Sequence, residues 1–386
     1  MLGIGKSLEV EDKLAILSQD SKYDLACACG TSDSEHRYRS KDGKWIYPVV
    51  LPDGRRTFLF KTLVSNVCVN NCKYCPLRAG RDQRRCTLGD RQLVDTFLDY
   101  YRRRLVSGLF LSSGVVGSPD QTMERINSAA AMLRQRQFKG YIHLKVIPGA
   151  SDAAIEEAVR LANAVSLNIE TPGEKHFQKV CTTKNYLDDI IRPMKLISNL
   201  TAHGNVGQTT QFVVGASDET DHEIVSYSWG LYKRLGLNRV YFSAYQRGIG
   251  EADIPGESQN KNDGDMLTRE HRLYQADWLI RKYGFNENEI PFEASGNLSL
   301  KSDPKEIWAS KHPEFFPIDI NRADKFALLR VPGLGLTTVS TILKARKDGV
   351  TFRSIEQISK LSRRLTKADR FLKFGYNPSR TTLFEL

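Results

Sequence analysis

The amino-acid sequence predicts an α/β fold: a parallel sheet that curls into an open, partial (β/α)6 barrel, followed by a small, basic, all-α domain. Apolar strand-like runs alternate with helical patterns through six βα units, which is typical of a parallel sheet covered by helices. Six units are too few to close an eightfold barrel. The composition then shifts, because residues 311–386 contain 15 Lys and Arg against 7 Asp and Glu.

The elements follow from the spacing of apolar residues, at period two in strands and at every third or fourth position in helices. The expected strands are residues 61–67, 108–112, 141–146, 165–170, 210–215 and 239–245. The expected helices are residues 90–105, 120–136, 151–163, about 185–200, about 221–235 and 268–283. We therefore expect an N-terminal extension (1–57), a barrel (58–300) and a basic helical domain (301–386).

Composition narrows the class of protein. The chain has 386 residues, a net charge of +11 and no apolar run that approaches the ~20 residues needed to span a bilayer. The N-terminus turns acidic before an apolar core of a signal peptide develops. Seven cysteines, an odd number, indicate a reducing compartment. We expect a cytoplasmic protein without a membrane partner, and the basic C-terminal region favours a polyanionic one.

Three cysteines lie within eight residues, in the stretch CVNNCKYC from Cys68 to Cys75. Structural zinc sites normally use four ligands in two pairs, whereas here the next cysteine, Cys86, stands alone. Three thiolates suit a cubane iron–sulfur cluster that leaves one iron open for a further ligand. The preceding strand places these cysteines on the loop that follows it.

The spacing C-x3-C-x-aromatic-C, with Tyr74 as the aromatic residue, resembles the motif of the radical SAM superfamily. The resemblance implies a [4Fe-4S] cluster whose open iron is chelated by the amino and carboxylate groups of S-adenosylmethionine. The reduced cluster would cleave this cofactor to a 5′-deoxyadenosyl radical that abstracts an unactivated hydrogen. An electron donor such as flavodoxin or ferredoxin is implied as a partner.

Functional residues of such barrels lie at the carboxyl ends of the strands. The superfamily usually has Gly-Gly-Glu at the end of the second strand, where this chain has Ser112, Ser113 and Gly114 and then Val115 in place of the glutamate. A carboxylate on the fourth strand suits the hydroxyls of a ribose. The cluster candidates are Cys68, Cys72 and Cys75, and the cofactor-binding candidates are Tyr74, Ser112, Ser113, Gly114, Asn168, Glu170, Gly215 and Ser243.

Longer stretches resemble one branch of the superfamily, the radical SAM proteins described as DNA modification or repair proteins and linked to a uracil-DNA glycosylase. These stretches include LFLSSGVVGSPDQTMERI, LNIETP, VYFSAY and HPEFFPIDINRADKFALLRVPGLG. The resemblance implies a DNA substrate and a partner similar to uracil-DNA glycosylase.

The segment from Phe316 to Gly349 resembles a helix-hairpin-helix with VPGLG as its hairpin. Asp319 or Asn321 would cap a first helix ending at Arg330, and residues 336–346 and 354–361 would form two more helices. Glycine backbone N–H groups at a helix N-terminus can hold a phosphate without reading sequence. The nucleic-acid-binding candidates are Gly333, Leu334, Gly335, Thr337, Lys344, Arg346 and Lys347.

The remaining cysteines, Cys27, Cys29, Cys86 and Cys181, leave two interpretations open: ligands of a second cluster, or small buried thiols. His143, on the third strand, fits a structural histidine better than a catalytic one.

The leading hypothesis is a radical SAM enzyme that modifies or repairs DNA. A radical SAM enzyme acting on transfer RNA would use the same basic domain, and competition between duplex DNA and transfer RNA would separate the two. A non-enzymatic iron–sulfur protein that binds nucleic acid or senses redox state would hold a cluster without cleaving S-adenosylmethionine.

Overall fold

The computed structural model describes residues 8–21, 46–50, 56–258, 262–359 and 367–375. The chain divides into two compact units, residues 1–271 and 272–386, and each unit is described by itself. The division falls within helix α9 (Asp263–Tyr283), earlier in the chain than the boundary expected at residue 301.

The first unit is built on a sheet of seven strands whose spatial order equals their order in the chain. β1 pairs antiparallel with β2, and every later neighbour pairs parallel. The sheet curls into an open half-barrel, which confirms the predicted fold class. The strands are β1 (Ile46–Val50), β2 (Arg56–Leu63), β3 (Gly108–Ser112), β4 (Tyr141–Lys145), β5 (Ala164–Ser166), β6 (Gly207–Val214) and β7 (Arg239–Ala244).

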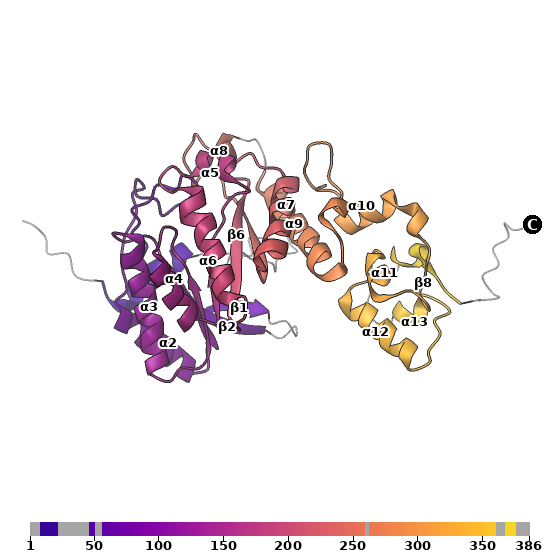
Figure 1. Ribbon diagram of the computed structural model, residues 1–386, viewed down its shortest axis with the longest axis horizontal. Coiled ribbons are helices and arrows are strands. Elements are labelled where there is room, and N and C mark those ends of the chain that lie inside the picture. The colour runs from indigo at the N-terminus through magenta and orange to yellow at the C-terminus, as the bar shows by residue number, and fades with distance from the viewer. Residues whose placement is uncertain (1–7, 22–45, 51–55, 259–261, 360–366, 376–386) are drawn as a thin grey trace, which may run out of the picture. The chain divides into compact units, whose positions relative to one another are not determined.

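Helices connect the parallel strands, and α2, α3, α4, α6 and α7 pack side by side in that order along one face of the sheet (Figure 1). No helix of the described residues is long and apolar enough to cross a membrane. The helices of this unit, besides α9, are α1 (Val10–Asp20), α2 (Asp90–Arg102), α3 (Pro119–Gln135), α4 (Asp152–Leu161), α5 (Glu174–Val180), α6 (Arg192–Thr201), α7 (Asp221–Leu235) and α8 (Pro255–Ser258).

Side chains alternate between the two faces of the strands and so separate the core from the concave side. The residues that face the helices are apolar and buried, whereas those that face the concave side include Lys61, His143 and Gln211. The hydrophobic core between sheet and helices contains Phe60, Leu109, Leu111, Ile142, Leu144, Val165, Phe212, Val214, Val240 and Phe242.

Several elements differ from their predicted bounds, and the three largest differences near the site are those of β2, β5 and the helix after Asn185. β2 begins at Arg56, five residues before the strand expected from residue 61. β5 ends at Ser166, and the chain then reaches Glu170 in a left-handed conformation, with φ at 65°, that no regular strand has. The helix expected near residue 185 begins as a π-helical turn (Tyr186–Ile191), with the Asn185 side chain accepting from the N–H groups that open it.

The second unit is mainly helical. Asp324 caps α11 by accepting from the N–H of Ala327 at 2.8 Å, so the predicted caps were wrong. Asp319 instead belongs to a short strand, and Asn321 bonds both backbone groups of Phe352. The elements are α10 (Pro304–Lys311), α11 (Lys325–Arg330), α12 (Leu336–Lys347), α13 (Glu356–Ser359) and the parallel strands β8 (Ile318–Asp319) and β9 (Leu372–Lys373).

A buried ion pair holds α9 against the loop between β6 and α7. The Arg269 guanidinium donates to Asp221 at 2.6 Å and to the Glu219 carbonyl at 2.8 Å. Asp221 is fully buried and Arg269 is 5% exposed. Removing one partner of such a pair strands the other charge in a medium of low dielectric constant.

We therefore expect Arg269→Met to destabilise the first unit by about 3–5 kcal/mol, measured by urea unfolding followed by circular dichroism. Arg103→Met is the matched control, because the ion pair of Arg103 with Asp99 is exposed on both sides and should contribute less than about 1 kcal/mol. Equal effects of the two changes would contradict this account of the buried pair.

Candidate active site

The three cysteines of the CVNNCKYC motif lie on the loop after β2, at the carboxyl end of the sheet. Cys72 is buried, whereas Cys68 and Cys75 are half-buried. The N–H of Cys75 donates to the carbonyl of Cys72 at 2.9 Å, which forms a tight turn between them. All three side chains line one cavity.

Backbone hydrogen bonds attach this loop to the end of β3. Gly114 donates to Ser65 at 2.7 Å, and Val69 donates to Val115 at 2.9 Å. A Cβ atom at Gly114 would lie 2.3 Å from the carbonyl oxygen of Val67, so only glycine permits this approach. The Ser-Ser-Gly segment predicted from the sequence is therefore where the cysteine loop meets the sheet.

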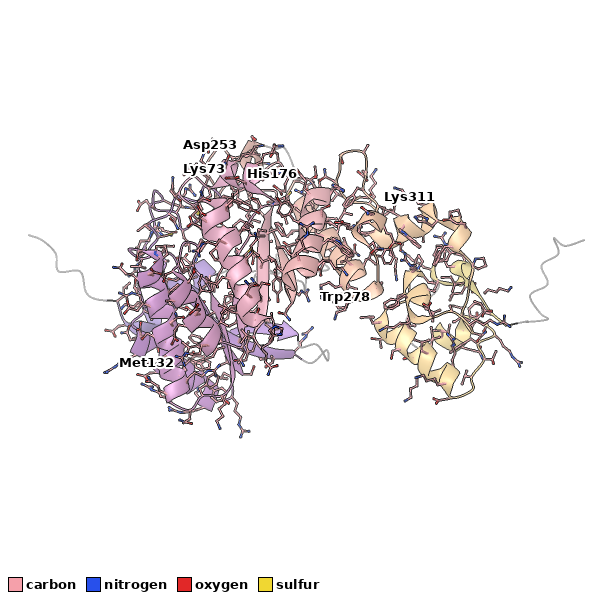
Figure 2. All side chains as sticks on the ribbon, viewed as in Figure 1. Lys73, Met132, His176, Asp253, Trp278 and Lys311 are labelled. Carbon is pink, nitrogen blue, oxygen red and sulfur yellow. The ribbon has the colours of Figure 1, made fainter. Side chains whose placement is uncertain are left out.

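A second set of contacts joins the cysteine loop to the segment after β7. Arg78 donates to the carbonyl of Ile249 at 2.8 Å and pairs with Glu251 at 3.3 Å. Lys73 forms an ion pair with Asp253, and both residues are labelled close together in Figure 2. The loop is thus held on two sides.

The cavity beside the cysteines has a volume of about 160 Å³ and opens to solvent. Tyr74, Ser112 and Ser113 lie in its wall, together with residues from the later strands. Of the predicted residues, the structure brings together Cys68, Cys72, Tyr74, Cys75, Ser112, Ser113, Gly114, Asn168, Glu170 and Ser243 around this cavity.

Gly215 does not line the cavity. Its φ is 84°, and a Cβ atom at this position would lie 2.2 Å from the side chain of Met266. Its N–H donates to the Glu219 carboxylate at 2.5 Å. The structure gives this glycine a role in the turn between β6 and α7.

Glu170 is held in place by both of its backbone groups. Its N–H donates to Gln211 at 3.0 Å, and its carbonyl accepts from Val213 at 2.8 Å. The Asn168 amide lies 3.5 Å from the Glu170 carboxylate, and both side chains are buried. A fixed carboxylate next to an amide is an acceptor site suited to ligand hydroxyl groups.

Asp20 and Lys184 also line the cavity, and sequence reasoning missed both. Asp20 ends α1, and its carboxylate accepts from the Asn66 amide at 2.7 Å. Lys184 follows α5. Burial alone would lower the pKa of its ammonium group, but negative charge on the neighbouring cysteines and on Glu170 outweighs burial and raises this pKa. Neither residue ends a strand, so the rule of strand ends does not select them.

Two of the cysteines, Cys72 and Cys75, lose their protons less readily than a free thiol while no metal is bound. Burial raises the pKa of Cys75 to about 11, and a hydrogen bond with Cys181 together with burial raises the pKa of Cys72. Iron binds the thiolate, so assembly of a cluster here releases protons. Within the described residues, no group of His, Cys, Asp or Glu side chains is arranged to hold a single metal ion.

The remaining cysteines are distributed over different places. Cys86 is buried, with its sulfur 3.9 Å from the carbonyl oxygen of Lys13. Cys181 is also buried, and its sulfur lies 3.7 Å from the sulfur of Cys72. Cys27 and Cys29 lie outside the described residues.

Comparison with known protein families shows which family this part of the chain resembles. Residues 62–227 match the family described as the Radical SAM superfamily, and this span contains the cysteine loop and Glu170. The chain contains a radical SAM domain. This match supports the cofactors predicted from the sequence, a [4Fe-4S] cluster and S-adenosylmethionine.

Solved structures with a similar arrangement include the FeFe-hydrogenase maturase HydG from Carboxydothermus hydrogenoformans, at 17% identity and a TM-score of 0.45. The match covers 57% of this chain and 50% of that one, so it spans half of the maturase. Methylornithine synthase is similar at 14% identity and a TM-score of 0.44, over 70% of this chain and 71% of that one. No curated protein sequence matches the chain.

The residues present fit these cofactors. Cys68, Cys72 and Cys75 would hold the cluster, because their thiols line the same wall of one cavity. Glu170 and Asn168 would bind polar groups of S-adenosylmethionine in the same cavity.

We expect Glu170→Gln to weaken binding of S-adenosylmethionine by about tenfold or more, because a hydrogen bond to a charged group contributes about 1.5–3 kcal/mol. Equilibrium dialysis of the cluster-loaded protein measures this. Glu157→Gln is the control, since Glu157 lies on α4 and pairs with Arg160 at the surface. An unchanged affinity in Glu170→Gln, at equal iron content, would rule out this role.

Proposed function

We propose that the protein is a radical SAM enzyme that modifies or repairs DNA, with the second unit holding the DNA backbone. The observation that carries the proposal is the basic helical hairpin formed by α11 and α12 in a chain that also contains a radical SAM domain. When bound, the cluster and S-adenosylmethionine supply a 5′-deoxyadenosyl radical. The chain's own residues have to position the substrate and exclude water.

The hairpin between α11 and α12 is a tight turn that a buried lysine side chain supports. Gly333 has φ at 88°, a conformation that favours glycine, and the N–H of Leu334 donates to Val331 at 3.1 Å. The ammonium of Lys305 is buried and donates to the carbonyls of Leu329 and Leu334 at 3.1 and 2.7 Å. The first N–H groups of α12 have no partner within the helix and favour an anion such as a phosphate.

The basic residues of α12 divide into two kinds. Lys344 and Lys347 are exposed, whereas Arg346 donates to the carbonyl of Ala323 at 2.5 Å and so supports the fold. Lys344 is about 12 Å along the helix from Leu336, at about 1.5 Å per residue. The two lysines would therefore contact different phosphates from the one at the hairpin.

The concave side of the sheet carries a packed group of one cation and two rings below the cavity. Lys61, Phe110 and His143 pair in register on β2, β3 and β4, one layer below Ser112, which lines the cavity. The Lys61 ammonium lies 4.6 Å from the centre of the Phe110 ring, and the His143 ring lies 4.5 Å from it. Lys61 and His143 are buried, so this group supports the layer of residues that would contact the substrate.

A base has to leave the stack of a duplex to reach an enclosed site, so the substrate would be flipped out or unpaired. The ion pairs of Lys73 and Arg78 with the segment after β7 would keep the cysteine loop in place beside the cavity and limit access of water.

The proposal also includes a low-potential electron donor such as flavodoxin or ferredoxin, and a partner similar to uracil-DNA glycosylase.

The test of the function is formation of 5′-deoxyadenosine by the reconstituted protein with dithionite and S-adenosylmethionine. We expect product formation to be faster with duplex or single-stranded DNA than with no nucleic acid or with transfer RNA. Stimulation by transfer RNA alone would replace DNA with RNA as the substrate. An intact cluster that yields no product would point to a non-enzymatic binding or sensing role.

Variants of the two units should separate their roles. Lys344→Glu together with Lys347→Glu should weaken DNA binding and reduce the dependence of log K on log salt by roughly two, since each lysine neutralises one phosphate. Cluster content should stay unchanged. Lys139→Glu together with Lys195→Glu makes the same charge change on exposed residues of the first unit and serves as the control.

The reciprocal variant, Cys72→Ala, should lose the cluster and product formation and keep DNA affinity. Loss of both properties from either variant would contradict a division of labour between the units. Fluorescence anisotropy with labelled DNA and iron analysis measure the two properties independently.

A further inference from the structure

Cys181, the residue after α5, lies directly against one of the cluster cysteines. Its sulfur is 3.7 Å from the sulfur of Cys72, and its side chain is 2% exposed. Cys72 lines the cavity and Cys181 does not. Seen from the cavity, the Cys181 thiol therefore lies behind the Cys72 sulfur. A group in this position would act on the cluster through Cys72.

Backbone contacts on both sides of Cys72 fix this arrangement. The N–H of Lys73 donates to the carbonyl of Val180 at 2.8 Å, and the N–H of Asn71 donates to the Thr183 hydroxyl at 3.4 Å. Because the main chain sets the distance, a change of side chain at position 181 leaves the two segments docked.

The helix that carries Cys181 is itself anchored. His176 of α5 is buried, with Nδ1 3.0 Å from an Asp218 oxygen and Nε2 3.1 Å from a Glu223 oxygen. The contact between the two cysteines thus rests on a held helix as well as on a held loop.

Lys184 brings positive charge to the same cavity. It lines the cavity together with Cys72, and negative charge on Cys72 is among the causes that raise the pKa of the lysine. The Cys72 side chain therefore has a thiol next to it and an ammonium group in the same cavity wall, both from the segment that follows α5.

These contacts have a defined consequence once iron is bound. A thiolate bound to iron carries no proton and can only accept, so with iron bound a hydrogen bond between the two sulfurs has Cys181 as its donor. Hydrogen bonds and positive charge next to a ligand sulfur stabilise the cluster that has gained an electron, and so raise its reduction potential.

We infer that Cys181, together with Lys184, sets the reduction potential of the iron–sulfur cluster through the Cys72 sulfur. Cys181 is a positioning residue in this role, because it does not touch the substrate or S-adenosylmethionine. The inference concerns the cluster alone and holds whichever substrate the enzyme takes.

The experiment is a redox titration of the cluster in the full-length protein, followed by electron paramagnetic resonance. Wild type, Cys181→Ala, Cys181→Ser and Lys184→Gln are reconstituted without oxygen and matched for iron content. We expect Cys181→Ala to lower the equilibrium constant for reduction about tenfold, which is about 59 mV for one electron. Cys181→Ser keeps a hydrogen-bond donor and should lie closer to wild type, and Lys184→Gln should also lower the potential.

Cys86→Ala is the matched control, because Cys86 is also buried and its sulfur contacts the Lys13 carbonyl instead of the cluster loop. Its midpoint potential should equal that of wild type. An unchanged potential in Cys181→Ala at equal iron content would overturn the inference, as would Cys181→Ser shifting as far as Cys181→Ala. Tighter binding of S-adenosylmethionine by Cys181→Ala would also overturn it, since that result would make Cys181 a competing iron ligand.

Discussion

The site depends on one close approach, that of the cysteine loop to the end of β3 at Gly114. The Val67 carbonyl occupies the space that a Cβ atom at position 114 would fill, and the hydrogen bond from Gly114 to Ser65 holds the two segments together. Parallel strands bring their carboxyl ends to one edge of the sheet. The glycine then places the thiols over that edge, where residues from the later strands can share a cavity with them.

The sequence allowed the sheet to be predicted because its signal is local. Apolar positions at period two placed β3 at its observed bounds, and helical periodicity did the same for α7. Glu170 lines the cavity as the rule of strand ends suggests, although β5 ends four residues earlier. The rule works there because Glu170 still forms a single bridge to Phe212 on β6.

What the sequence could not give was set by tertiary contacts. Asp20 reaches the cavity from a helix that precedes the barrel, and Lys184 reaches it from a loop after α5. Gly215 follows β6, which ends at Val214, one residue earlier than expected, and Met266 of α9 packs against it. The capping residue of α11 was misplaced because Asp319 pairs with β9, far along the chain. Each case turns on a contact that no local pattern records.

The charges around the cavity are distributed in a way that suits two cofactors of opposite character. Three thiolates on the cysteine loop add negative charge when iron binds, and Lys184 lines the same cavity. S-adenosylmethionine carries a cationic sulfonium, and Asp20 and Glu170, both carboxylates, line the cavity. Buried charges are costly unless each has a partner of opposite sign. The lysine therefore offsets the cluster ligands and the carboxylates offset the cofactor, so loading either cofactor alone leaves part of this charge unbalanced.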